Sequence, residues 1–366
     1  GLPSAAVSAL GAFSGEGDLT YFVDQDGEST AQSYSGKDLT DKPAIVLMDS
    51  GSASASEIFA GGVLGTGSGI VIGTRSYGKG VAQVLYDELN CPYLHGDAVK
   101  VTAYRFYCAG GNTTDRIGVV PALYIPQDQA VAAARLLSGE KTKDSAYLRL
   151  VLNDCDFYID IPAGKESSSA ALEAILAALT PDAVLYWGEN GGERKLTLAQ
   201  AREKCGFAAS SALDFSDVAD SEYAQEIDSL AASRIVFGDG GKFRPNATMT
   251  RAEVCALLAQ ALDLYSTANG CFTDVAKGSW YAPSVNAMAA IGLVSGVGGG
   301  KFDPNATMTQ EEFITVLGRL VEFVNLDARK FLDKNPAAHF AAAAEVQELF
   351  TLGHPQRGAF DEFRVR

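Results

Sequence analysis

The sequence Gly51-Ser52-Ala53-Ser54-Ala55-Ser56-Glu57-Ile58 joins two different hydrophobic patterns. It follows an apolar run at 44–48, which has the composition of a buried strand, and it begins a run with helical spacing at 54–64. A serine at a strand-to-helix junction lies on a sharp turn, so its hydroxyl projects beyond the end of the sheet. The amide of Ala55 then points at any oxyanion that forms beside Ser54, and the positive end of the helix favours that negative charge.

A second motif, Ser76-Tyr77-Gly78-Lys79-Gly80-Val81-Ala82-Gln83, follows another strand-like run at 69–73. Adjacent strands would bring Lys79 back to the end of the sheet that carries Ser54. Glycines on both sides of Lys79 let its backbone approach other segments closely. Burial among apolar neighbours would favour the neutral amine, which can take a proton as a histidine does elsewhere. Together the two motifs predict a serine nucleophile with a lysine base.

Each motif alone has a simpler interpretation. The stretch 54–57 is a capping box, in which the serine oxygen accepts a backbone amide and the glutamate reaches back. The sequence around Lys79 alone is typical of a turn with a solvated lysine. Only the pair of motifs favours a catalytic dyad. Ser52 and Ser56 compete with Ser54 by composition, whereas the pattern gives no support to Ser76.

With these motifs, residues 1–127 resemble the tail-specific, or carboxyl-terminal processing, serine peptidases. The resemblance implies an α/β core of the crotonase/ClpP-like kind, with Ser54 as the nucleophile, Lys79 as the base and Gln83 orienting the lysine. It also implies a protein or peptide substrate and no cofactor.

In this family a PDZ module and a glycine-rich loop precede the region that we match. That loop supplies an oxyanion-hole amide in addition to that of Ala55. Gly1 is either the last glycine of the loop or unrelated to it. We therefore expect a fragment, or a shortened member, of a longer peptidase.

Composition argues against several other function classes. The chain has 366 residues, of which 47% are hydrophobic and 20% charged, which is typical of a globular protein with two or three domains. A net charge of −16 disfavours binding to nucleic acid or anionic lipid, and no apolar run approaches the roughly 18 residues that span a bilayer. The three histidines form no helical pair and no CxxC occurs, so we expect no metal site. His95 lies in a loop-like stretch and is not expected to complete a triad.

The C-terminal part of the chain repeats itself. Phe215-Ser216-Asp217-Val218 recurs as Phe272-Thr273-Asp274-Val275, and the stretch 243–250 recurs at 302–309. Each copy has the pattern of a helix, a glycine-rich loop, a Pro-Asn turn and a second helix. One such helix pair cannot bury its own apolar face, so the copies must stack on one another.

These copies resemble S-layer homology repeats, all-α modules that hold exported bacterial proteins on cell-wall polysaccharide. The resemblance implies glycan contacts by Arg251, in Thr250-Arg251-Ala252-Glu253, and a position near the groove for Trp280. The alternatives are that the T-x-x-E stretches at 250–253 and 309–312 only cap helices, and that Trp280 packs in a core. The second copy has Gln310 at the position of Arg251 and so lacks the cation. Residues 327–366 have the pattern of a degenerate third copy.

Residues 144–212, between these two parts, match no pattern with a known role. Strands predicted at 147–152, 157–161 and 183–187 and helices at 169–179 and 197–204 make this segment a small α/β domain. The predicted architecture is therefore multidomain, with domains at 1–143, 144–212 and 213–366. The last of these holds copies at about 213–269, 270–326 and 327–366.

The six cysteines are too few for a disulfide scaffold. Cys91 and Cys108 flank one strand-like region and are the first candidates for a bridge. The alternative is that the cysteines are buried free thiols.

Two functions follow from these patterns. The first is an exported bacterial serine endopeptidase that its C-terminal repeats hold on wall polysaccharide. The second is a non-catalytic surface protein, in which an incomplete peptidase fold serves as a binding or scaffold module. A Lys79 amine within about 2.6 to 3.2 Å of the Ser54 hydroxyl would favour the first.

Overall fold

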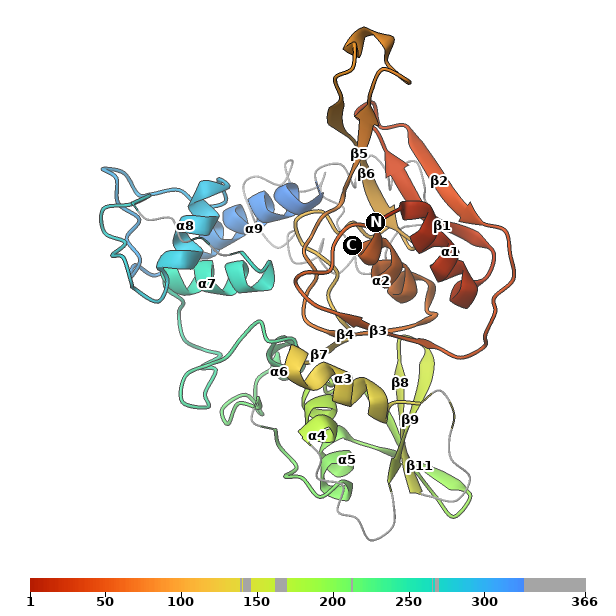
Figure 1. Ribbon diagram of the computed structural model, residues 1–366. Coiled ribbons are helices and arrows are strands. Elements are labelled where there is room, and N and C mark those ends of the chain that lie inside the picture. Colours follow the sequence, from red (N-terminus) through yellow and green to blue (C-terminus); the bar gives the residue numbers. More distant parts are fainter. Residues whose placement is uncertain are drawn as a thin grey trace. The chain divides into compact units, whose positions relative to one another are not determined.

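The fold is taken from a computed structural model that describes residues 1–138, 140, 146–161, 170–211, 213–264, 266 and 270–325 (Figure 1). The predicted third repeat at 327–366 lies outside the described residues. The chain forms two compact units, Gly1–Phe243 and Arg244–Arg366. Their boundary falls inside the first predicted repeat, and the domain boundaries predicted at residues 143 and 212 stay predictions.

The first unit begins with an antiparallel sheet that α1 (Pro3–Ser14) accompanies. The order of its strands is β2-β1-β6-β5, and they are β1 (Gly17–Val23), β2 (Ser29–Tyr34), β5 (Val81–Tyr86) and β6 (Val99–Cys108).

A parallel sheet carries the first predicted motif. Its order is β3-β4-β7, with β3 (Ala44–Met48), β4 (Gly69–Gly73) and β7 (Leu123–Tyr124), and α2 (Ala55–Thr66) connects β3 to β4. All residues of β4 are buried, as expected of a parallel strand that is covered on both faces. The two apolar runs and the helix between them were therefore predicted correctly.

Two adjacent glycines let α2 pack closely on its neighbours. A Cβ on Gly62 would lie 2.2 Å from Cδ2 of Leu10 in α1, and one on Gly61 would lie 2.6 Å from Sγ of Cys108 in β6. Any side chain at these positions would push α2 away from α1 and β6. This close packing holds α2, which carries Ser54 at its N-cap, against α1 and β6.

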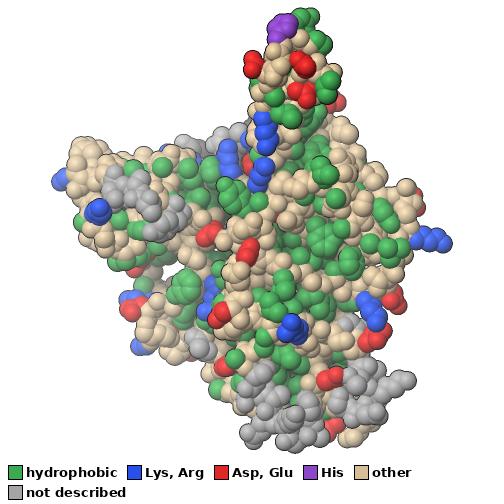
Figure 2. Space-filling model, viewed as in Figure 1, with side chains coloured by type: hydrophobic (Ala, Val, Ile, Leu, Met, Phe, Trp, Pro, Cys, Tyr) green, Lys and Arg blue, Asp and Glu red, His purple; other side chains and the backbone are tan. Residues whose placement is uncertain are grey.

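The hairpin of β5 and β6 projects from the rest of this part of the chain (Figure 1). A short 3₁₀ helix, η1 (Pro92–Leu94), lies in its connection. Hydrophobic and acidic side chains share its surface (Figure 2), and its large exposed apolar residues are Leu85, Tyr86, Leu89, Tyr93, Val99, Val101 and Tyr104.

The middle segment contains the predicted strands and helices and one more strand. Its antiparallel sheet has the order β11-β10-β8-β9, with β8 (Ala146–Leu152), β9 (Cys155–Ile161), β10 (Val184–Glu189) and β11 (Gly192–Leu196). Its helices are α4 (Ala170–Ala177) and α5 (Leu198–Lys204), and α3 (Gln127–Leu136) precedes the segment. The additional strand is β11, in which Glu193, Arg194 and Lys195 are exposed at the edge of the sheet.

The middle segment and the first part of the chain share one hydrophobic core. Ile70 and Ile72 of β4 are fully buried in the same cluster as Leu148 of β8 and Ile175 of α4. The amide of Asn153, in the turn between β8 and β9, donates to the carbonyls of Leu64 (3.1 Å) and Gly69 (2.8 Å) around the end of α2. The parallel sheet therefore depends on residues beyond the first motif region for its burial.

The suggested Cys91–Cys108 bridge is wrong, because all six cysteines are free. Cys108 is the last residue of β6, whereas Cys91 precedes its first residue, Val99. At about 3.3 Å per residue, the strand alone separates the two ends by roughly 30 Å. The alternative of buried free thiols holds for Cys108, Cys205 and Cys255.

The repeats have matching local structures. In the first unit, α6 (Ala224–Ala232) follows Phe215, whose ring packs 5.5 Å from that of Phe243. The second unit has α7 (Arg251–Ala261), α8 (Ala282–Ala290) and α9 (Gln310–Asn325), and the rings of its equivalent pair, Phe272 and Phe302, lie 5.2 Å apart. Asp217 and Asp274 each accept the backbone N–H of the second phenylalanine at 2.8 Å. The predicted helix, glycine loop and helix pattern is thus confirmed for two copies.

Candidate active site

Ser54 lies at the junction between β3 and α2 and has an unusual backbone conformation. It is the N-cap of α2, with φ +60° and ψ −115°. Residues other than glycine adopt such positive φ values at a cost of about 1–3 kcal/mol, and such strain is common at functional sites. The Ser54 side chain is half-buried, and Ala55 is the first residue of the helix. Among the described residues, nothing accepts the Ala55 N–H.

A buried carboxylate, that of Glu57, ties the two predicted motifs together. Its Oε2 accepts the backbone N–H of Ser54 at 2.7 Å and that of Lys79 at 2.9 Å. Its Oε1 accepts the hydroxyl of Ser76 at 2.6 Å and the N–H of Gly78 at 2.7 Å. Because one oxygen binds the amides of both Ser54 and Lys79, their backbones must lie close together.

Further hydrogen bonds, one between backbones and one to a side chain, hold the Lys79 segment in this position. The N–H of Tyr77 donates to the carbonyl of Ser52 at 2.9 Å. The hydroxyl of Ser76 accepts the N–H of Val119 at 2.6 Å and donates to Glu57, so both bonds of this hydroxyl are to groups of the fold. Ser76 has no free role as a nucleophile, in agreement with the sequence analysis.

The glycines beside Lys79 are required by close backbone contacts. A Cβ on Gly80 would lie 2.4 Å from the backbone nitrogen of Asp115. Gly78 has φ +87°, and a Cβ there would lie 3.1 Å from the carbonyl carbon of Arg116. The predicted close approach of this segment to another part of the chain is therefore observed.

The side chains of the predicted dyad are not joined. Lys79 is half-buried, and in the described parts of the chain its amine makes no hydrogen bond with Ser54. Gln83 is exposed on β5, and its amide donates to the hydroxyl of Thr102 at 3.4 Å. The catalytic roles of Ser54, Lys79 and Gln83 stay predictions, although the first two residues are brought to one place.

The two predicted oxyanion-hole residues lie next to each other. A Cβ on Gly1 would lie 2.9 Å from the Cβ of Ala55. A residue with a side chain at position 1 would therefore collide with the start of α2, unless the chain shifted. This contact places the backbone of Gly1 beside the helix end that carries the free N–H of Ala55.

Sequence reasoning found the two motifs but missed the residue that connects them. Glu57 reads as the last residue of a capping box, and it does reach back to the N–H of Ser54. Its bonds to Gly78 and Lys79 join segments more than 20 residues apart, and no local pattern encodes them. The one available signal is that Glu57 lies beside Ile58 on the face of α2 that the apolar spacing buries.

A thiol lies behind the same carboxylate. Cys108 is fully buried, and its Sγ donates to the carbonyl of Glu57 at 3.5 Å. Burial, and to a smaller extent the negative charge of Glu57, raise the pKa of Cys108 to about 12. The thiol therefore stays protonated at neutral pH and does not act as a nucleophile.

A separate groove of about 520 Å³ lies in the second unit. Arg251, Glu312 and Arg319 line it together with Val294, Val297 and Met308. Arg251 is 7% exposed: its Nε donates to the carbonyl of Phe302 (2.9 Å), Nη2 to that of Ser295 (3.0 Å), and Nη1 to Oε1 of Glu312 (3.2 Å). Arg251 thus lines this groove with its donors directed at protein groups, and its glycan contact stays a prediction.

Trp280 does not line this groove and is 65% exposed, with its ring 5.4 Å from that of Tyr281 in an edge-to-face arrangement. The alternative that Trp280 packs in a core is therefore wrong. Thr250 and Thr309 each form a capping box with the glutamate three residues later, as the simpler interpretation of the T-x-x-E stretches predicts.

Within the described ranges, no three His, Cys, Asp or Glu side chains come together as a metal site. No described helix is both long and apolar enough to cross a bilayer.

Comparisons with known proteins match the two ends of the chain to different families. Residues 1–125 match peptidase family S41, and residues 214–255 and 272–314 match the S-layer homology domain. The chloroplastic carboxyl-terminal-processing peptidase 3 of Arabidopsis thaliana is 36% identical over 108 residues, which are 29% of this chain and 20% of that protein. The surface-layer 125 kDa protein of Lysinibacillus sphaericus is 30% identical over 136 residues, which are 37% of this chain and 11% of that protein.

Among solved structures, the photosystem II D1 C-terminal processing protease is 29% identical, with 37% of this chain and 35% of that chain covered and a TM-score of 0.32. The chain spans about a fifth to a third of the length of the processing peptidases that it matches. It is a multidomain α/β protein that carries a peptidase family S41 segment in its first part and S-layer homology domains in its last part.

Proposed function

We propose that this chain belongs to an exported, cell-wall-associated serine endopeptidase of the carboxyl-terminal processing type. Ser54 is the nucleophile, Lys79 is the base, and the substrate is a protein or peptide. A crotonase/ClpP-like core is part of the proposal, supported by the parallel β3-α2-β4 arrangement. The bacterial cell surface as its location is supported by the S-layer homology domains.

The bonds of Glu57 are the observation that carries the proposal. They place the Ser54 turn and the Lys79 segment on one carboxylate, although the chain separates the two residues widely. The four-carbon stem of a lysine can span the distance from a neighbouring backbone to the Ser54 hydroxyl. A capping box alone would not require Glu57 to bind the amides of Gly78 and Lys79.

The proposed chemistry is acyl transfer in two steps. The neutral amine of Lys79 takes the hydroxyl proton while the Ser54 oxygen attacks the peptide carbonyl carbon, and the carbonyl π electrons move to its oxygen. The Ala55 N–H, with a second amide at the position of Gly1, would stabilise that oxyanion. The oxyanion collapses, the C–N bond breaks, and the leaving amine takes the proton from Lys79. Water then attacks the acyl-enzyme by the same route and restores Ser54.

A fluorophosphonate probe, which labels activated serines covalently, tests the peptidase proposal on the full chain. We expect labelling that is lost in Ser54→Ala and Lys79→Ala and retained in Ser52→Ala. The Ser52→Ala variant is the matched control, because Ser52 lies on the same turn and hydrogen-bonds only Asp49 through its hydroxyl. Labelling that survives in Ser54→Ala would show that another residue is the nucleophile.

We propose that the repeats bind acidic wall polysaccharide through the groove at Arg251. A guanidinium suits a carboxylate ligand, and the present carboxylate partner of Arg251, Glu312, is about half exposed. A glycan carboxylate would replace Glu312 in this pair. A contact by Trp280, which is exposed, stays a prediction. Sedimentation of the full chain with purified cell walls, compared between the native sequence and Arg251→Lys, tests this part.

One observation favours a second candidate function. The Lys79 amine makes no hydrogen bond with Ser54 among the described residues, and Gln83 binds Thr102 instead of Lys79. A surface protein whose peptidase part binds peptides without cleaving them would have such a site. It would bind wall material in sedimentation while Ser54 stays unlabelled, both in this chain and in a longer chain that includes the upstream loop.

A further inference from the structure

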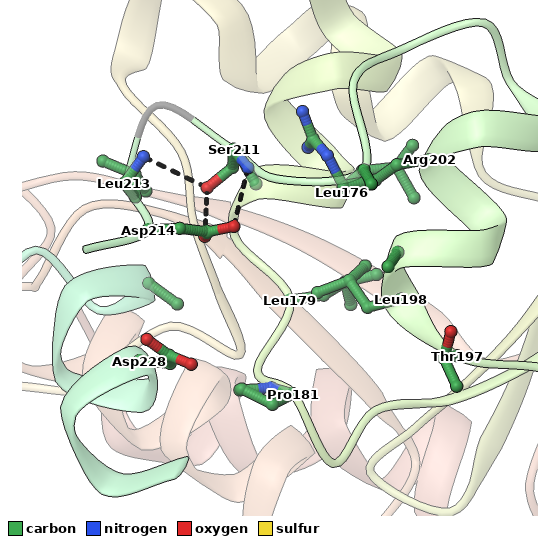
Figure 3. Close-up of a pocket in the computed structure, with 14 residues that line it drawn as sticks. Leu176, Leu179, Pro181, Thr197, Leu198, Arg202, Ser211, Leu213, Asp214 and Asp228 are labelled. Carbon is green, nitrogen blue, oxygen red and sulfur yellow. Dashed lines mark hydrogen bonds between the residues drawn. The ribbon is translucent and has the colours of Figure 1, made fainter. Parts of the chain in front are cut away.

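A cavity of about 240 Å³ lies in the first unit, and none of the residues that line it belongs to the peptidase family match (Figure 3). Its walls come from α4, α5, α6 and the segments that connect them. Aliphatic side chains, those of Leu176, Leu179, Pro181, Leu198 and Leu213, share the walls with polar and charged ones, among them Thr197, Arg202 and Asp228. Small-molecule sites commonly combine apolar walls with a few polar groups that fix the orientation of the ligand.

A buried arginine lines one side of the cavity. Arg202 of α5 is only 3% exposed. Its Nε donates to the carbonyl of Ala208 at 2.9 Å, and its Nη2 lies 4.0 Å from the carboxylate of Glu173. Its Nη1 is buried and has no acceptor among the described residues. A buried charged donor without an acceptor is costly, so an acceptor from outside the protein is expected there.

Two carboxylates from other elements line the same cavity. Asp214 is engaged, because its oxygens accept the hydroxyl (2.6 Å) and the N–H (2.8 Å) of Ser211. Asp228 of α6 has a buried Oδ1 that no described group donates to. Burial, and then the charge of Asp214, raise the pKa of Asp228. A cationic donor beside Asp228 would stabilise its carboxylate and so offset the effects of burial and of the Asp214 charge.

The two unsatisfied groups have opposite charge and do not form an ion pair with each other within the described residues. A single ligand that carries both an anion and a cation can satisfy both. We propose that this cavity binds a small zwitterion, an amino acid or dipeptide with an apolar side chain, whose carboxylate accepts from Arg202 and whose ammonium donates to Asp228. The apolar side chain packs against the leucines.

The size of the cavity agrees with such a ligand. At roughly 30 Å³ per molecule in the liquid, about eight waters would fill it. An aliphatic side chain would bury apolar surface against the leucine and proline side chains of the wall. The cavity is also smaller than the usual pocket of a drug-sized molecule, which begins near 300 Å³.

Isothermal titration calorimetry on the full chain tests the proposal with matched probes. L-Leucine and glycyl-leucine carry both charges, N-acetyl-leucine lacks the ammonium, and leucinamide lacks the carboxylate. We expect one of the two zwitterions to bind, and the two singly charged analogues to bind at least about tenfold more weakly, because each loses a charged hydrogen bond. The comparison of L-leucine with glycyl-leucine distinguishes the amino acid from the dipeptide.

Variants of Asp228 and Arg202, with one control, test which charged group of the ligand each side chain binds. Asp228→Asn keeps the shape of the side chain and should weaken binding of the zwitterion about tenfold or more. Glu226→Gln removes a charge from the exposed face of the same helix and should leave binding unchanged. The ammonium-free analogue should lose nothing further in Asp228→Asn, which a merely structural effect of the substitution would not produce. Arg202→Gln should weaken leucine but leave leucinamide unaffected.

Several results would overturn the proposal. One is no heat from any probe, with ordered waters alone on Arg202 and Asp228 in a crystal structure. Another is equal binding of leucine, N-acetyl-leucine and leucinamide. A third is binding that Glu226→Gln weakens as much as Asp228→Asn. None of these measurements depends on peptidase activity, so the proposed peptidase function stands or fails separately.

Discussion

Glu57 in the first unit and Arg251 in the second are both buried charged side chains at the start of a helix, and both hold distant segments together. Glu57 accepts four hydrogen bonds, three of them from backbone N–H groups. Arg251 donates three, two of them to backbone carbonyls. The first is a negative charge near the positive end of α2, a favourable arrangement, whereas the second is a positive charge near the positive end of α7.

The two sites differ in whether a partner can leave. The Glu57 partners are three main-chain groups and a buried serine, so no ligand can replace one without moving the backbone. Glu312, the charged partner of Arg251, is about half exposed and can turn into solvent. A buried ion whose partners are all fixed holds its neighbours in place, and one with an exchangeable partner can also bind a ligand.

The largest expected effect is that of Glu57→Ala. It leaves four donors without an acceptor, and we expect the free energy of unfolding to fall by about 3–5 kcal/mol, as when one partner of a buried charge network is removed. Urea unfolding measures this change. Glu57→Gln should cost less because its amide oxygen still accepts, and Glu222→Ala, at an exposed position, should cost nearly nothing. A loss below about 1 kcal/mol in Glu57→Ala would contradict a fixed role for this carboxylate.

The next largest effect on the free energy of unfolding distinguishes Arg251 from its partner Glu312. Arg251→Met removes a buried donor of three hydrogen bonds, so we expect a loss of about 2–4 kcal/mol in the free energy of unfolding. Glu312→Gln should cost less than about 1 kcal/mol, because the pair is partly in solvent. Equal losses in the same urea titration would mean that Glu312 is as fixed as the partners of Glu57, and the distinction between the sites would disappear.

A smaller effect tests how the Lys79 segment reaches Glu57. In Gly80→Ala the added methyl would meet the backbone of Asp115, so we expect a loss of about 1–3 kcal/mol from the strain of overpacking. Gly192→Ala is the control, because its Cβ would have no neighbour closer than 3.9 Å. Serine-probe labelling should fall in Gly80→Ala only. A Gly80→Ala variant as stable as Gly192→Ala would show that the segment does not pack as described.

The smallest effect at neutral pH concerns the thiols next to the two ions. Burial raises the pKa of Cys108 and of Cys255 to about 12; Glu57 adds to the first shift, and Arg251 opposes the second. The folded state therefore holds these protons more tightly than the unfolded state, whose ordinary thiol pKa is 9.0. Below pH 9 this contribution to stability is complete, and it is lost as the pH rises toward 12.

Two measurements check this expectation. The free energy of unfolding should decline between pH 9 and 11, and less steeply in Cys108→Ala. At pH 8, a disulfide reagent should modify the exposed Cys271 quickly and Cys108 only through unfolding. Equal rates at Cys271 and Cys108 would show that the thiol behind Glu57 is accessible.

Continuous apolar runs made the parallel strands predictable. Residues 44–48 and 69–73 became β3 and β4, because strands buried on both faces need hydrophobic side chains throughout. β11 was not predicted, because its consecutive charged residues are exposed at a sheet edge and form no apolar run. Exposed edge strands depend on pairing with a neighbour, which here is β10, and pairing is a property of the tertiary structure.

At the site, the sequence placed the two motifs but not the contact between them. Ser54 and Lys79 could be paired because each has its own local pattern. Glu57 has one too, and the capping box accounts for its presence, so only its place on the buried face of α2 hinted at further bonds. For Arg251 the local pattern predicted a ligand contact and gave no sign of a structural role. In the structure its Cζ lies 4.7 Å from the ring centroid of Phe302, so the guanidinium also packs against the protein.

The cluster around Ile70, Ile72, Leu123 and Ile125 limits how this chain can be divided. An excised piece that ended at residue 125, where the peptidase match stops, would expose these side chains to water and would be prone to aggregate. A truncation intended to isolate the proposed catalytic part should therefore extend through α5, to about residue 211. The same constraint applies to exchange of the peptidase part between proteins during evolution. A protein that acquires this part must also supply hydrophobic residues that cover the parallel sheet.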